Sequence, residues 1–144
     1  MEINKLLAEI EELVPFYMAI PEDQAKSKGV AAVCIICADG QIFGKIFGNL
    51  KLRGKDSFRI AWTKASQVWI TGYKTNEYER LVFSDQIDYH DFGISMPDLV
   101  GYEGGQPITL RDGTKISVGF SGFRGSSDLE IVLKALDKIN KNEL

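Results

Sequence analysis

Apolar residues near the N-terminus recur at positions three and four apart, which is the spacing of an amphipathic helix. We therefore predict a helix over residues 3–14. Pro15 should end or kink it, because proline lacks an amide donor and clashes with the preceding turn. A short second helix is predicted over residues 21–28, since Pro21 suits a first helical position and Gly29 a helix end.

The clearest helical pattern lies in residues 57–71, where large and small apolar side chains form one stripe. Asp56 or Ser57 is predicted to cap the start of this helix, and Gly72 suits a left-handed C-terminal cap. The helix should lie against a sheet, and we interpret both of its tryptophans as core residues. The stripe consists of Phe58, Ala61, Trp62, Ala65, Val68 and Trp69.

Two more helices are predicted, one over residues 76–83 with Thr75 as its cap and one over residues 126–140. The last helix has apolar residues at helical spacing, which we expect to point inward. They are Leu129, Val132, Leu133, Leu136 and Ile139.

Two segments have the pattern of β-hairpins. Residues 30–38 form a short apolar run, typical of a strand buried on both faces, and the pair Asp39-Gly40 suits a tight turn into a returning strand over residues 41–48. A second hairpin joins residues 107–110 to residues 115–121.

Between the predicted helix 76–83 and the second hairpin, residues 84–106 look irregular, and so long a loop often borders a site. Two hairpins joined through helices form an antiparallel sheet more easily than a parallel one. The doubly apolar first strand requires helices on both sides. We therefore predict a single α+β domain over residues 1–144, a three-layer α/β/α sandwich with an antiparallel sheet.

Composition narrows the classes of function. The formal net charge is −3 and no basic run occurs, so nucleic acid is not an expected partner. The apolar run of residues 30–38 is too short to span a bilayer, and the acidic N-terminus is unlike a signal peptide. We therefore expect a cytoplasmic protein with no membrane partner.

The two cysteines match the spacing of a redox pair or half a zinc site. Cys34 and Cys37 lie within a predicted strand, however, where positions three apart point to opposite faces about 10 Å apart. That separation exceeds disulfide reach, and no second pair completes a zinc site. We interpret both as buried small hydrophobic residues, and we predict no metal site.

Three features of the chain offer groups that bind ligands. His90 is the only histidine; it is either a metal or haem-iron ligand or a general base, or a solvated loop residue. Met96, in the same loop, would supply a soft sulfur ligand. Residues 119–128 lead from a strand into a helix, where free amides, Gly122 and Arg124 suit an anion, although the segment also reads as a flexible capped turn.

Hydrolytic chemistry has little support in the sequence. With one histidine and no nucleophile-elbow sequence, none of the serines is predicted to act in a catalytic triad.

GGQPITL at residues 104–110, SVGFSG at residues 117–122 and an Asp-containing final helix together resemble the GlcG/HbpS-like family. The helix with Lys64 between Ala61 and Ala65 looks like the Lys-Ala helix of that family. The chain is also similar to the C-terminal domain of PduO-type proteins. Residues 1–24 depart from the family, since its alanine-rich first helix is replaced by a segment with two prolines.

The resemblance implies a profilin-like α/β/α sandwich that assembles into homo-oligomers, dimers or larger rings. It also implies a small-molecule ligand, with haem, corrinoid or another tetrapyrrole as the ligand class. We expect a non-catalytic binding domain with a site built from Gly104, Gly105, Gly122, Arg124, His90 and Met96. The alternatives are a scaffold protein without a ligand, and an enzyme acting on haem or a small anionic metabolite.

Overall fold

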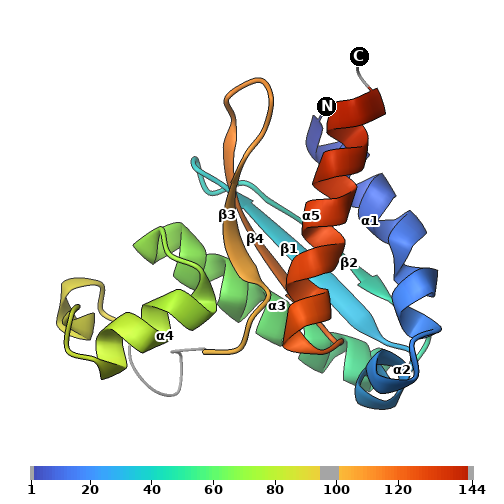
Figure 1. Cartoon of the computed structure of the whole chain (residues 1–144), viewed down its shortest axis with the longest axis horizontal. Helices are drawn as coiled ribbons and strands as arrows, with labels where there is room; N and C mark the ends of the chain where they lie inside the picture. The colour runs from blue at the N-terminus through green and yellow to red at the C-terminus, as the bar shows by residue number, and fades with distance from the viewer. Residues whose placement is uncertain (1, 95–100, 143–144) are drawn as a thin grey trace.

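The computed structural model describes residues 2–94 and 101–142 and contains a single antiparallel sheet with helices on both faces (Figure 1). The strands lie in the order β2-β1-β4-β3. Along the chain the elements are α1 (Glu2–Met18), α2 (Pro21–Ser27), β1 (Ala31–Cys37), β2 (Ile42–Phe47), α3 (Lys51–Thr71), α4 (Thr75–Phe83), the 3-10 turn η1 (Tyr89–Asp91), β3 (Gly105–Thr109), β4 (Lys115–Ser121) and α5 (Gly125–Asn142).

Helices α1 and α5 cover one face of the sheet, and α3 covers the other (Figure 1). In the central strand β1, Val33 and Ile35 face α1 and α5, whereas Ala32 and Cys34 face α3. Strand β1 is therefore buried on both sides, as its continuous apolar run predicted. The three-layer α+β sandwich with an antiparallel sheet is confirmed.

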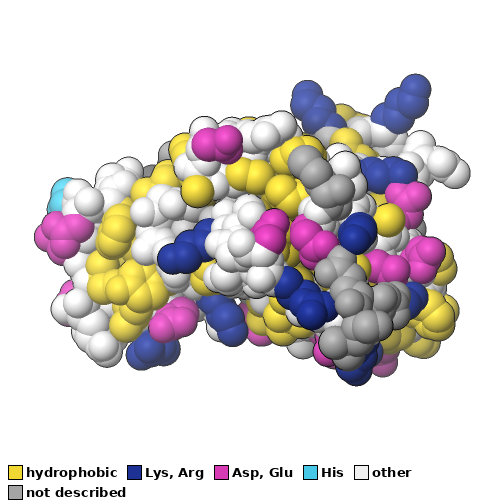
Figure 2. All heavy atoms as spheres, turned by 90° about the horizontal axis from the view of Figure 1, so that it is seen from above, with side chains coloured by type: hydrophobic (Ala, Val, Ile, Leu, Met, Phe, Trp, Pro, Cys, Tyr) yellow, Lys and Arg dark blue, Asp and Glu magenta, His cyan; other side chains and the backbone are white. Residues whose placement is uncertain are grey.

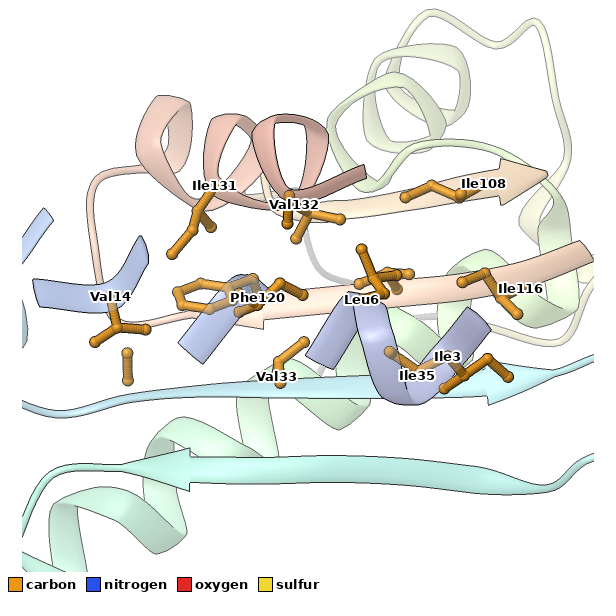
Figure 3. Packing of buried hydrophobic residues seen from close by; sticks show 14 of the residues in the cluster. Ile3, Leu6, Val14, Val33, Ile35, Ile108, Ile116, Phe120, Ile131 and Val132 are labelled. Carbon is orange, nitrogen blue, oxygen red and sulfur yellow. The ribbon is translucent and has the colours of Figure 1, made fainter. Parts of the chain in front are cut away.

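The larger core lies between the sheet and the pair α1–α5. Ile131 of α5 lies over Phe120 of β4, and Leu6 of α1 belongs to the same cluster of buried side chains (Figure 3). These three side chains are fully buried, and each contributes about 1.5–3 kcal/mol of hydrophobic free energy. This core fixes where the N-terminal end of α5 lies relative to the sheet.

The α3 side of the sheet is packed more closely, because its residues are small. A Cβ atom added at Gly119 of β4 would lie 2.1 Å from the carbonyl oxygen of Ala61 in α3, so only glycine fits. At Gly105 of β3 an added Cβ would lie 2.5 Å from Cγ2 of Thr75. These glycines bring the backbone of α3 down onto β3 and β4.

Several helix boundaries differ from the prediction. Helix α1 continues past Pro15 to Met18, because Val14 and Tyr17 both pack in the core and the carbonyl of Pro15 still accepts from the amide of Ala19 at 3.1 Å. The loss of one helical hydrogen bond is outweighed by this burial.

Helix α3 begins at Lys51, six residues before the predicted start, and its N-cap Leu50 makes no side-chain cap bond. The predicted caps Asp56 and Ser57 lie inside the helix. Gly54 permits the early start, since a Cβ there would lie 2.6 Å from Cγ2 of Ile46 in β2. The predicted cap at Thr75 is also wrong, because Thr75 opens α4 and Lys74 is its N-cap.

The interpretation of the tryptophans as core residues is wrong. Trp62 is 45% exposed and Trp69 46% exposed. Small residues such as Ala61 and Ala65 on the sheet-facing side of α3 bring the helix close to the sheet, so the space between them is too narrow for an indole ring. On α5, Leu133 is likewise 47% exposed instead of inward, whereas Val132 and Ile139 are buried as predicted.

Several local predictions are confirmed. Both hairpins form, and Gly40 and Gly72 have the positive φ angles that a tight turn and a left-handed helix cap require. Cys34 and Cys37 are free thiols on opposite faces of β1; Cys34 is buried as predicted, whereas Cys37 is only half-buried. Within residues 2–94 and 101–142, no helix has both the length and the apolar character needed to cross a membrane.

Candidate functional site

A cleft of about 390 Å³ opens where α2, the first half of α3 and the connection from β4 to α5 meet. Its volume lies in the range of about 300–1,000 Å³ that is usual for ligand pockets. The residues around it are Lys26, Ser27, Val30, Arg53, Asp56, Ser57, Ile60, Lys64, Tyr102, Ser121, Gly122, Phe123, Gly125 and Asp128.

The floor of the cleft holds a buried pair of opposite charges. Lys64 extends from α3, and its Nζ donates to the carbonyl oxygen of Phe120 at 2.8 Å and to Oδ2 of Asp128 at 3.3 Å. Asp128 lies in the first turn of α5, and its Oδ1 accepts from the amide of Phe123 at 3.0 Å. Each of the two side chains is only 3% exposed.

Glycines make the room that this pair needs. A Cβ atom at Gly104 would lie 2.7 Å from Nζ of Lys64 and 2.5 Å from the carbonyl oxygen of Phe120, and Gly104 has φ +122°. A Cβ at Gly119 would lie 3.0 Å from Cβ of Lys64. The double glycine at residues 104–105 therefore lets the backbone pass close to Lys64 on the side away from the cleft.

Burial shifts the pKa of both members of the pair toward their neutral forms. The pKa of Asp128 rises to about 7, because removal from water outweighs the nearby Lys64 ammonium and the Phe123 amide. Burial lowers the pKa of Lys64, against the opposing attraction of Asp128. Burial thus disfavours the charged forms of both groups, and protonation of Asp128 would remove the negative charge that faces Lys64.

The rim of the cleft also carries cations. Arg53 of α3 donates from Nε to the carbonyl oxygen of Ser27 at 2.8 Å and from Nη2 to that of Lys26 at 2.7 Å. The guanidinium thus ties α3 to the end of α2, and the exposed Lys26 lies beside it at the rim. With Lys64 below, this arrangement suits a small anion.

Arg124 has a partner within the chain. Its amide and its Nε donate to Oδ1 of Asp23 at 2.9 and 3.0 Å, and Ser127 donates to Oδ2 of Asp23 at 2.7 Å. Asp23 is completely buried. Burial raises the pKa of Asp23, but these hydrogen bonds together outweigh it and hold the pKa below its usual value. The anion at the start of α5 is therefore a carboxylate of α2.

The predicted site residues are only partly brought together. Gly122 lines the cleft, and Gly104 and Gly105 lie behind Lys64 and beside Thr75. His90 lies in η1 with its side chain 72% exposed, and its Nδ1 is 2.7 Å from Oδ1 of Asp88. Figure 2 shows this histidine at one end of the molecule, and it does not line the cleft.

Met96 lies outside the described residues. Within residues 2–94 and 101–142, no three histidine, cysteine or acidic side chains are grouped so that they could hold a metal ion.

Sequence reasoning gave no functional role to the two residues at the floor. Lys64 and the acidic residue of the last helix entered only as parts of the family resemblance. A lysine on the sheet-facing side of an apolar helix stripe, three residues after Ala61 and one before Ala65, was the signal that could have identified the first.

Solved structures with the same fold include Klebsiella pneumoniae protein ORFY, described with the family model DUF336. It is 17% identical, with a TM-score of 0.62 over 92% of this chain and 86% of that one. The structure of a PduOC:heme complex is 20% identical, with a TM-score of 0.61 over 92% and 90% of the two chains. Ybr137w protein is 14% identical, with a TM-score of 0.68 over 98% and 79%.

No protein-family model and no curated protein matches the sequence. Because the solved structures of protein ORFY and of PduOC share the fold, the resemblance to the GlcG/HbpS-like family and to the PduO C-terminal domain is confirmed at the level of the fold.

Proposed function

We propose that this chain is a non-catalytic small-molecule-binding domain whose cleft holds an anionic group of its ligand. The observation that carries this proposal is the buried Lys64–Asp128 pair at the floor of the cleft. A buried ion pair is weak evidence for stability, because desolvation offsets most of the attraction between the charges. Ionisable groups with perturbed pKa values in a cleft are typical of functional sites.

A tetrapyrrole is the ligand class that the fold favours, since a PduOC protein of the same fold was crystallised as a heme complex. The carboxylates of such a ligand suit Lys26, Arg53 and the floor of the cleft. Iron in haem is held by histidine, cysteine, methionine or tyrosine, and Tyr102 is the one such residue among those described at the cleft. The cleft therefore fits the carboxylate edge of a tetrapyrrole better than its iron.

Titration of the ¹⁵N-labelled chain with metal-free protoporphyrin IX, and separately with benzoate, tests the proposal. We expect amide shifts to change at Gly122, Phe123 and Gly125 around the cleft. Lys26→Gln should weaken binding several-fold, because it removes a rim cation, whereas Lys134→Gln on the exposed side of α5 should not. Shift changes confined to other surfaces, or none, would refute the proposal.

The Soret band of added haemin shows whether the iron of a tetrapyrrole binds at Tyr102 in the cleft or at His90 in the loop with η1. If the ring lies in the cleft, Tyr102→Phe should alter the Soret band and His90→Ala should leave it unchanged. The reverse result would place the iron at the loop with η1. Haemin that gives no Soret change with the wild-type chain would remove haem from the ligand class.

We also propose that the chain forms homo-oligomers through strand β2. Within the described part of the chain, no strand pairs with the outer side of this edge strand, and Ile42 and Ile46 are 51% and 44% exposed on its α3-facing side. Leu50 and Leu52, which follow it, are exposed as well. A second copy can pair with the edge about a two-fold axis, which covers the same residues on both chains.

A further inference from the structure

The floor of the cleft has free bonding capacity that the fold does not use. Lys64 has three N–H donors, of which two point to Phe120 and Asp128. On Asp128, Oδ1 accepts from the Phe123 amide, and among the described residues Oδ2 accepts only from Lys64. One Lys64 donor and one further acceptor position on Oδ2 are therefore unused by the described residues, and both side chains line the cleft.

We propose that this floor is a carboxylic-acid site, in which a ligand carboxylate accepts from the remaining N–H of Lys64 and shares with Asp128 Oδ2 one proton taken from solvent. The proton bridges the two carboxylates, and no covalent bond forms or breaks. This inference rests on the proposed function and adds to it the class of the ligand group and the proton that accompanies it.

Charge balance carries the inference. With Asp128 ionised, the Lys64–Asp128 pair is neutral, and an incoming carboxylate would meet a second carboxylate in a buried site. Two carboxylates in contact cannot both ionise, so one of them takes up a proton. Burial has already brought the pKa of Asp128 to about 7, so this uptake needs little further free energy near neutral pH.

Other charged groups face the pair from each surrounding element. Lys26 of α2 and Glu103, just before β3, act on it at longer range with opposite signs. On α3, Arg53 and Asp56 border the same cleft. Asp23 of α2 is neutralised by Arg124, because that contact holds the pKa of Asp23 below its usual value. An incoming carboxylate favours the charged form of Lys64, so the group that we expect to change charge with the ligand is Asp128.

Calorimetric titration of the full chain with benzoate, in two buffers of different ionisation enthalpy, measures the protons taken up per ligand. We expect almost none at about pH 5.5, where Asp128 is already protonated, and close to one at about pH 8. The affinity should fall about tenfold per pH unit above about pH 7. Benzamide, with the same ring and no charge, should show neither effect.

Two variants locate the proton. Asp128→Asn keeps the acceptor for the Phe123 amide but cannot titrate, so its benzoate affinity should be independent of pH between about 6 and 8. Asp137→Asn, which removes an exposed carboxylate of α5 that does not line the cleft, should keep the wild-type pH dependence. If Asp128→Asn does not fold, the wild-type protein still shows whether a proton is taken up, and its absence at about pH 8 overturns the inference.

The outcomes separate the two proposals. Benzoate binding at the cleft without proton uptake at about pH 8 would overturn the carboxylic-acid site and leave the binding function standing. Absence of benzoate binding from about pH 5 to about pH 8 would overturn the carboxylic-acid site, and the binding function would fall with it only if protoporphyrin IX also left the amide shifts around the cleft unchanged. A proton uptake that persists in Asp128→Asn would assign the proton to another group and also overturn the inference.

Discussion

Lys64 and Asp128 form a buried polar site at positions where apolar side chains would stabilise the fold as well or better. Each is almost fully buried, and each lies where an apolar side chain would continue the core between α3, β4 and α5. Replacing a buried ion pair by hydrophobic residues is often neutral or stabilising. The pair therefore needs a reason beyond folding, and its position at the cleft supplies one.

The raised pKa of Asp128 makes the stability of the folded chain depend on pH. Because the folded state holds this proton more tightly than the unfolded state, wild-type stability should fall as the pH rises from about 4 to about 7, by at most about 1.4 kcal/mol per pH unit. Above that range this contribution is constant.

Urea denaturation at several pH values, for the wild-type chain and for Asp128→Asn, measures the effect. The free energy of unfolding of the variant lacks this contribution, so the difference between the two proteins should change with pH in this window. Parallel pH profiles would show that Asp128 titrates in the folded chain as it does in the unfolded one.

At the scale of elements, Asp23 joins the short helix α2 to the start of α5. A seven-residue helix has little stability of its own, so α2 depends on tertiary contacts. Asp23 supplies them through the Arg124 backbone and side chain and through Ser127. The same contact satisfies donors at the first turn of α5, which keeps Asp128 in place over the floor of the cleft.

Removal of the Asp23 carboxylate should therefore loosen both helices. Asp23→Ala should lower the free energy of unfolding by about 3 kcal/mol, since it leaves buried donors without an acceptor. Glu22→Ala, one position earlier and exposed, should change it by less than about 0.5 kcal/mol. Chemical denaturation measures both, and equal effects would contradict this role for Asp23.

Close packing of α3 on β4 is a second feature at the scale of elements. Gly119→Ala should push α3 away, because the new Cβ would meet the carbonyl oxygen of Ala61, and we expect a loss of about 1–3 kcal/mol. Gly72→Ala, at an open helix end with φ +79°, should cost only about 1 kcal/mol of backbone strain. Thermal denaturation compares the two, and a larger loss for Gly72→Ala would refute the packing argument.

Most elements were predictable because their signals are local. The pair Asp39-Gly40 specifies its own turn, and the apolar run of β1 specifies burial on both faces. The start of α3 was missed because it depends on Gly54 fitting against Ile46 of a neighbouring strand. The floor of the cleft was missed for the same reason, since Lys64 and Asp128 are 64 residues apart and meet only through the fold.

At the scale of the whole molecule, the exposed residues along β2 and α3 predict how copies associate. Ile46→Lys should dissociate an oligomer that pairs through β2, because a charge on an edge strand opposes further pairing. Leu133→Lys, on α5 across the sheet and similarly exposed, should leave it intact. Native mass spectrometry measures both, and an oligomer unaffected by Ile46→Lys would place the interface elsewhere.

The strand order β2-β1-β4-β3 also sets when the chain can fold as it is synthesised. The centre of the sheet joins β1 to β4, which follows it by about 80 residues, and α1 packs against α5 at the opposite end of the sequence. Such non-local contacts make folding slow, typically milliseconds to seconds. The hairpin of β1 and β2 can form while the chain is still being synthesised. The core and the cleft can form only after α5 has left the ribosome, because both contain residues of α5.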